Sequence, residues 1–150
     1  GDDFIVARYT AGGKLDGTFD GDGVAVAILG GADAVDAVAV RPDGRVVAAG
    51  NSQRATGPSA GLSVVQLLPG GGLDPAFGNG GVVSTGFNAG AAEVLLDAAG
   101  RVVLGSTLNS QFAVFRFLPA GGLDPAFGTG GIATLATPGP FGAGVNGVRF

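Results

Sequence analysis

The stretch that decides the fold is PGGGLDPAFGNGGV at residues 69–82, because it returns as PAGGLDPAFGTGGI at residues 119–132. The two copies differ at only three pairs of positions, 70/120, 79/129 and 82/132. A third copy, AGGKLDGTFDGDGV at residues 11–24, keeps the Leu-Asp pair, the Phe that follows it and several glycines. Repetition of this kind indicates a fold built from tandem structural units.

A second block recurs between these motifs. VAVRPDGRVV at residues 38–47 matches VLLDAAGRVV at residues 94–103, and VNGVRF at residues 145–150 resembles the start of another copy. An apolar run precedes each Leu-Asp motif, at residues 4–9, 62–67 and 112–117. From the start of that run to the motif Phe the distance is always 15 residues, which indicates a rigid hairpin.

The full period is less regular, at 58 residues from Phe19 to Phe77 and 50 from Phe77 to Phe127. The largest part of the difference falls in NSQRATGPSAG at residues 51–61, a turn-rich segment. Surface loops tolerate changes of length better than strands do. The sequence therefore predicts a loop at residues 51–61.

Each unit is expected to hold four short strands. In the best-defined unit these cover residues 35–40, 45–49 and 62–67, and a fourth strand begins near Phe77 and runs through residues 81–84. Turn residues separate them, at Pro42-Asp43-Gly44 and at residues 70–72. We predict a single repeat array with a partial unit at 1–32, full units at 33–88 and 89–142, and the start of a further unit at 143–150.

The composition supports an all-β fold of short strands and tight turns. Gly accounts for 31 of the 150 residues, yet 46% of residues are hydrophobic and only 13% are charged, unlike a disordered chain. A four-stranded unit of about fifty residues is typical of a β-propeller blade. We predict a β-propeller-like array of four-stranded antiparallel blades; the alternative is a β-solenoid, whose coils repeat at roughly 20–30 residues.

The array is expected to be incomplete. Propellers close with about 4–8 blades, more than the units counted here. Either the chain is a fragment of a longer array, which we favour, or copies of the chain associate to complete a ring. In both cases the expected partners are further repeat units.

The composition also excludes several functions. The net charge of −4, with Lys and Arg scattered singly, argues against a nucleic-acid partner. No apolar run approaches the roughly 20 residues that span a bilayer. His and Cys are absent, which removes the commonest general base and the thiol nucleophile. We therefore predict no enzymatic activity, no catalytic residues and no cofactor.

The best metal candidates are Asp16, Asp20 and Asp22, within the acidic stretch DGTFDGDG at residues 16–23. Calcium prefers several oxygen ligands, and turns rich in Asp and Gly can supply them. An EF-hand beginning at Asp20 fails, however, because Val24 would stand at its third ligand position. A solvated turn is the favoured interpretation, and a calcium- or carbohydrate-binding propeller is the alternative function.

The recurring Asp of the Leu-Asp motif (Asp16, Asp74 and Asp124) has a structural explanation. An Asp in a turn accepts a hydrogen bond from the backbone N–H two residues on. Arg8 and Arg116 each lie eight residues before the motif Asp, so we predict an ion pair across the hairpin in these two units. Gln66 takes the same place before Asp74 and predicts a hydrogen bond. The Leu and Phe of the motif are expected to be buried between blades.

These residues resemble the bacterial delta-60 repeat, which is grouped with β-propeller-like domains of unknown function. The resemblance is carried by residues 4–9 and 112–117, by both LDPAFG-x-GG segments and by Arg41-Pro42-Asp43-Gly44-Arg45. It covers essentially the whole chain, with departures at Gln66, Asp20, Asp22 and residues 97–99. It implies a propeller-like structural or protein-interaction module of a larger exported bacterial protein, located outside the cell or on its surface. It transfers no active site.

Overall fold

The computed structural model describes residues 3–54 and 61–135, and these form strands and turns without any helix. The strands build three antiparallel sheets. Blade I holds β1 (Phe4–Ala7) and β2 (Val24–Ala27). Blade II holds β3 (Gly31–Val40), β4 (Val46–Arg54), β5 (Gly61–Leu67) and β6 (Val82–Ser84). Blade III holds β7 (Ala89–Leu96), β8 (Val102–Leu108), β9 (Gln111–Phe117) and β10 (Ile132–Leu135).

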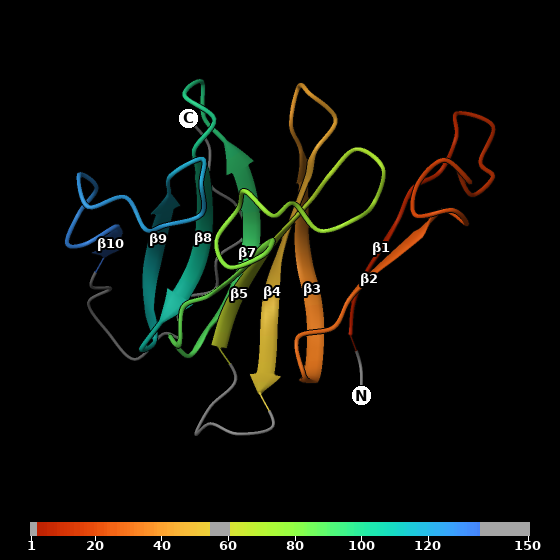
Figure 1. Cartoon of the computed structure of the whole chain (residues 1–150). Coiled ribbons are helices and arrows are strands. Elements are labelled where there is room, and N and C mark those ends of the chain that lie inside the picture. Colours follow the sequence, from red (N-terminus) through yellow and green to blue (C-terminus); the bar gives the residue numbers. More distant parts are fainter. Residues whose placement is uncertain (1–2, 55–60, 136–150) are drawn as a thin grey trace.

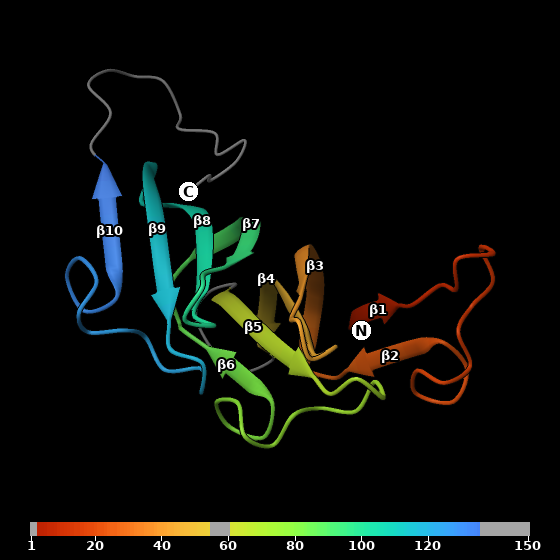
Figure 2. The ribbon, with the colours of Figure 1, turned by 90° about the horizontal axis from the view of Figure 1, so that it is seen from above.

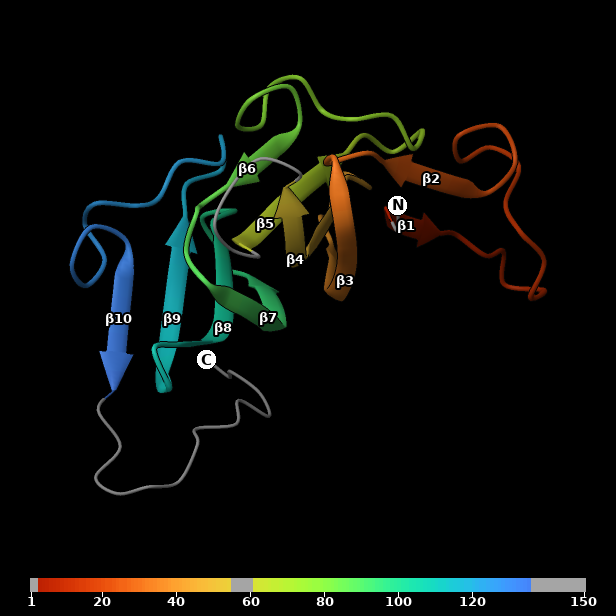
Figure 3. The ribbon, with the colours of Figure 1, turned by 90° about the horizontal axis from the view of Figure 1, so that it is seen from below.

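The three blades follow one another along the chain and stand side by side in space (Figure 1). Blades II and III are four-stranded meanders, in which each strand pairs with the next along the sequence. Seen from above, β3 and β7 lie where the two sheets converge, whereas β6 and β10 lie where they diverge (Figure 2). The view from below shows the same arrangement of the three sheets (Figure 3). The predicted all-β, propeller-like array is confirmed, and the solenoid alternative is wrong because the repeating unit is a four-stranded sheet.

The hydrophobic core is the space between neighbouring blades. Blades I and II enclose one apolar cluster, which includes Phe4, Phe19, Val65 and Leu67. Blades II and III enclose a larger one, built from Val47, Val64, Phe77, Leu104, Phe115 and other apolar residues. Each full blade thus covers its neighbour with one face, which explains why its central strands are apolar at nearly every residue.

The strand boundaries differ from the prediction in the middle of blade II. β4 continues to Arg54, because residues 51–54 pair with residues 31–34 of β3. The expected loop at 51–61 is therefore wrong for its first four residues and for Gly61, which opens β5, and 55–60 lie outside the described residues. The polar Asn51 and Gln53 suggested a loop, but the earlier start of β3 at Gly31 offers their backbone a pairing partner.

The fourth strand also begins later than expected. Phe77 lies in a tight turn, where its N–H donates to the Asp74 carbonyl and its own carbonyl accepts from Gly81. β6 therefore starts at Val82 rather than near Phe77.

β3 begins two residues before the expected unit boundary at residue 33, and β7 begins at the expected residue 89. The expected start of a further unit at 143–150 lies outside the described residues.

Candidate functional site

The recurring Asp of the Leu-Asp motif holds the turn that follows it. In each blade its Oδ1 accepts a backbone N–H from two residues on, at 3.0 Å, with the donors Thr18, Ala76 and Ala126 for Asp16, Asp74 and Asp124. The predicted turn role of the motif Asp is confirmed. Because the same bond recurs three times, this carboxylate is part of the repeat geometry.

The other carboxylate oxygen ties the turn to the third strand of its blade. The Arg8 Nε lies 2.9 Å from Asp16 Oδ2, and the Arg116 Nε lies 2.8 Å from Asp124 Oδ2. In blade II, Gln66 Nε2 donates to Asp74 Oδ2 at 2.7 Å. Both predicted ion pairs and the weaker, hydrogen-bonded version in blade II are confirmed.

In blades II and III a second arginine, which was not predicted from the sequence, contacts the motif carboxylate. Arg45 lies 3.1 Å from Asp74 and Arg101 lies 3.5 Å from Asp124, each from the start of its blade's second strand. The sequence does carry a signal for this second arginine, because Gly-Arg-Val-Val recurs in both full units. The motif Asp therefore joins the second strand, the third strand and the turn of blades II and III.

These contacts lower the pKa of all three motif carboxyls. For Asp16 the main cause is the pair of hydrogen bonds from the hydroxyl and the N–H of Thr18. For Asp74 burial raises the pKa, but hydrogen bonds from Ala76, Gln66 and Arg45 outweigh it. For Asp124 the N–H of Ala126 contributes most. The carboxylates are held in the charged form and have partners, unlike a general acid.

The three metal candidates do not form a ligand cluster. Asp16 is engaged by Arg8 and Thr18, and Asp22 Oδ1 accepts the Val24 N–H at 2.8 Å. Asp20 has a positive φ of 50°. Across 3–54 and 61–135, no group of three or more His, Cys, Asp or Glu residues is placed to hold a metal ion.

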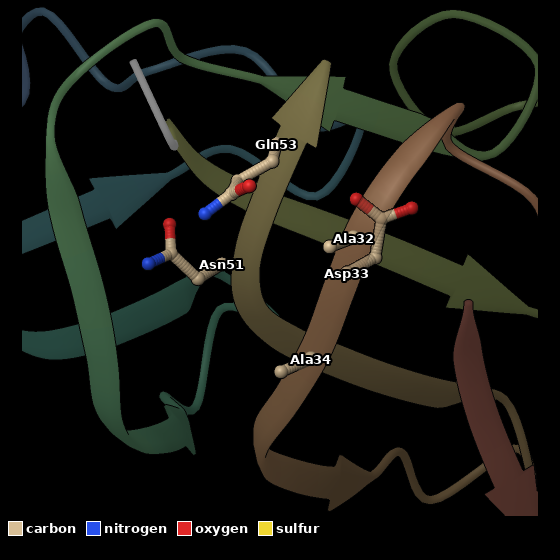
Figure 4. A pocket seen from close by; sticks show the side chains of 5 residues that line it. All are labelled: Ala32, Asp33, Ala34, Asn51 and Gln53. Atoms are coloured by element: carbon tan, nitrogen blue, oxygen red, sulfur yellow. The ribbon is translucent and has the colours of Figure 1, made fainter. Parts of the chain in front are cut away.

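A small cavity of about 240 Å³ lies at the ends of β3 and β4, lined by Ala32, Asp33, Ala34, Asn51 and Gln53 (Figure 4). It falls below the roughly 300 Å³ at which ligand pockets usually begin. Ala32 and Ala34 point to one side of β3, and the Asp33 carboxylate points to the other (Figure 4). The Asp33 carboxylate and the Asn51 amide therefore do not converge on one ligand.

Asp33 is nevertheless unusual, because its side chain is only 4% exposed and both carboxylate oxygens lack a hydrogen-bond partner. The hydroxyl of Ser52, which stands opposite Asp33 across the β3–β4 pair, also lacks one. A buried polar group without a partner destabilises the fold by about 1–3 kcal/mol. No sequence pattern marked Asp33, because an Asp at a strand end is ordinarily solvated.

Residues 57–61 read GPSAG, which spells the Gly-x-Ser-x-Gly motif of serine hydrolases. In that motif the Ser stands on a turn from a strand into a helix. Here Gly61 opens the strand β5, and the sequence contains no His to activate a serine. Residues 57–60 lie outside the described part of the chain. The last residue of the motif, Gly61, begins a strand, whereas the hydrolase motif continues into a helix.

The described part of the chain contains no helix long and apolar enough to cross a membrane.

Fold and motif together define a propeller-like array of four-stranded blades, whose recurring charged residues stabilise the units themselves. Residues 41–77 match the model of a family described as a β-propeller domain of unknown function (DUF5122). This match runs from the β3–β4 turn to the motif Phe of blade II and confirms the predicted relation to a β-propeller-like family of unknown function. A comparison with curated proteins found no match.

Proposed function

We propose that this chain is a non-catalytic structural or protein-interaction repeat module. The observation that supports this proposal best is the use of the motif carboxylates. A motif carboxylate recurs once in each blade, at Asp16, Asp74 and Asp124. Each accepts a backbone N–H and is bonded by side chains of its own blade. Such residues hold the units in register and leave binding to the surfaces of the blades.

The proposal includes the absence of catalysis and of a resident cofactor. A sequence without His or Cys lacks the usual nucleophile-activating groups, and no cavity described above gathers two converging carboxylates. The resemblance of the sequence motifs to the delta-60 repeat supports a role inside a larger exported bacterial protein. We place the module outside the cell or on the cell surface.

Calorimetric titration with calcium chloride tests the non-metal part of the proposal. We expect no binding heat beyond dilution. A saturable heat that is lost in Asp20→Ala and Asp22→Ala, and kept in Asp43→Ala, would contradict it. Asp43 is a suitable control because it is an exposed Asp in a different turn.

Incubation with chromogenic glycosides, esters and phosphates tests the non-catalytic part. We expect no turnover above buffer; turnover that disappears in Asp33→Ala would show that the buried carboxylate has a catalytic role. Immunodetection in fractions of the producing bacterium tests the location, with the signal expected in the medium or at the cell surface.

A further inference from the structure

The two blade–blade interfaces share one contact, made by the turn between the third and fourth strands. We call this the glycine turn; it covers residues 10–14 in blade I, 68–72 in blade II and 118–122 in blade III. At the I–II interface the N–H of Asp20 donates to the Gly70 carbonyl at 2.7 Å, and at the II–III interface the N–H of Gly78 donates to the Ala120 carbonyl at 2.8 Å. Asp20 and Gly78 both directly follow the motif Phe.

The fit at this contact is close enough to require glycine. A Cβ on Gly71 would lie 2.6 Å from the Asp20 nitrogen, and a Cβ on Gly121 would lie 2.8 Å from the Gly78 nitrogen. Both glycines also have φ near +100° (99° and 96°), which other residues rarely adopt. At the first interface Arg8 adds a hydrogen bond to the Pro69 carbonyl at 2.6 Å. Blades I and II thus each receive the glycine turn of the next blade against the residue that follows the motif Phe.

Blade III presents the same receiving groups without an occupant among the described residues. Gly128 follows the motif Phe and has φ of 53°, close to the 56° of Gly78. Phe127 is half-buried, whereas Phe19 and Phe77 at the same position are fully buried. A cavity of about 310 Å³ lies at this place, lined by Asp97, Arg101, Val103, Arg116 and Phe127.

We call the surface formed by Phe112, Val114, Phe127, Gly128, Ala133 and Leu135 the forward face of blade III.

Blade I presents the complementary half. Its glycine turn has the same backbone hydrogen bonds as the other two, from Thr10 to the Lys14 carbonyl and from Gly13 to the Thr10 carbonyl. Gly13 has φ of 75°, but no atom lies within 4 Å of the place where its Cβ would stand. Tyr9 is 62% exposed, whereas Leu67 and Phe117, at the same position in blades II and III, are 2% and 0% exposed. Ile5 and Val26 are paired neighbours and are also exposed, on what we call the rear face of blade I.

We propose that a second copy of this chain docks head to tail, with the glycine turn at residues 10–14 of one copy on the forward face of blade III of the other. Continuity with the two interfaces inside the chain supports this occupant, because both halves of the same contact are present, one at each end of the array. The N–H of Gly128 then donates to the Gly12 carbonyl, and Arg116 reaches the Ala11 carbonyl, as Asp20 and Arg8 do toward blade II. The inference rests on the proposed function, since it names the partner of the interaction module.

A contact between two different surfaces of one chain is heterologous, so copies add in one direction and form a ring or an open chain. The rear and forward faces can therefore be disabled separately. Tyr9→Glu places a charge on the rear face, and Leu135→Glu places one on the forward face. Both residues are exposed in the single chain, so its fold tolerates the change. Val40→Glu is the matched control, because Val40 is as exposed as these residues and lies on the inner strand β3, away from both faces.

Sedimentation velocity of the whole chain, from low micromolar to millimolar concentration, tests the proposal. We expect the mean mass of the unaltered chain and of Val40→Glu to rise with concentration. Each of the two face variants alone should stay monomeric, with association weakened about tenfold or more, because docking would bury an unpaired charge. Mixed in equal amounts, Tyr9→Glu and Leu135→Glu should form a dimer, since the mixture keeps one intact rear face and one intact forward face.

Three results would overturn the head-to-tail contact. They are a monomer at every concentration, association that persists in both face variants, and association that fails to return when the two face variants are mixed. A monomeric result leaves the proposed function standing, because a non-catalytic module can bind other proteins. Calcium binding or turnover, in contrast, would contradict the proposed function whatever the state of association.

Discussion

At the residue scale, the motif Asp connects three parts of its blade through one carboxylate. In blade II, Asp74 accepts from Ala76, Gln66 and Arg45, and its side chain is almost fully buried. Gln66 in turn accepts from Arg41, which also donates to the Gly100 carbonyl of blade III. The carboxylate therefore contributes both to the turn inside its blade and, through Gln66 and Arg41, to the contact with the next blade.

Asp74→Ala should lower the free energy of unfolding by about 1–3 kcal/mol, because Gln66 is buried and would lose its acceptor. Asp74→Asn should cost less, since an amide oxygen can still accept from Ala76. Urea unfolding followed by circular dichroism measures both. Equal losses for the two variants would show that the charge, and not the hydrogen-bonded geometry, stabilises the turn.

Asp33→Ala should have the opposite effect and raise the free energy of unfolding, by about 1–3 kcal/mol, because it removes a buried carboxylate whose oxygens have no partner. Asn88→Ala, a truncation of an exposed polar side chain, serves as the control and should change stability little. A loss of stability in Asp33→Ala would mean that the carboxylate has a stabilising partner.

At the element scale, the motif Phe fills the space between one blade and the next. Phe19 and Phe77 are fully buried in this way, whereas Phe127, the motif Phe of the last described blade, is half-buried. The expectation that every motif Phe is buried is therefore wrong for blade III. The motif Leu is not fully buried in any of the three blades. Leu15 and Leu73 are 46% and 40% exposed at the edge of the glycine turn, whereas Leu123 is half-buried and packs against the core cluster between blades II and III.

Phe77→Ala should lower the free energy of unfolding by about 3–5 kcal/mol, the usual cost of truncating a buried Phe. Phe127→Ala should cost roughly half of that or less at concentrations where the chain is monomeric. Urea unfolding at low protein concentration compares the two. Equal losses would show that Phe127 is covered in solution.

At the scale of the whole molecule, carboxylates that are stabilised in the charged form make the fold sensitive to acid. The pKa values of Asp16, Asp43, Asp74, Asp97 and Asp124 are all lowered by hydrogen bonds and neighbouring arginines. Partial desolvation beside Ala91 of β7 raises the pKa of Asp36 instead. Lowered carboxyls outnumber the raised one, so the unfolded chain takes up protons first as the pH falls.

We therefore expect the urea midpoint to be lower at pH 3 than at pH 7. The stability from the five lowered carboxyls is present above the unfolded pKa of about 3.9 and is lost as the pH falls through their folded values. Asp36 has the opposite effect on the free energy of unfolding as the pH falls, because the folded chain favours the protonated form of this carboxyl. Asp36→Asn should accordingly lose stability more steeply between pH 7 and pH 3. A midpoint that rises on acidification would contradict this assignment.

Much of the molecule was predictable from repetition in the sequence. The constant 15 residues from the apolar run to the motif Phe identified the hairpin, and the paired positions Arg8/Asp16 and Arg116/Asp124 identified its ion pairs. Such features are local, because the bonds join residues that are close in the chain. A pattern that recurs at fixed spacing reports local structure directly.

Only the tertiary structure decided what happens between units. The sequence suggested a loop at residues 51–54, but pairing with residues 31–34 makes them strand. It did not show that Arg41 reaches Gly100 or that Asp33 is buried without a partner. Nor did it show that the glycine turns of blades II and III lie against the residue that follows the motif Phe of the preceding blade. These outcomes depend on which surfaces of distant segments meet. Sequence repetition determined the blade, and packing between blades determined which of its residues are buried and which remain available to a partner.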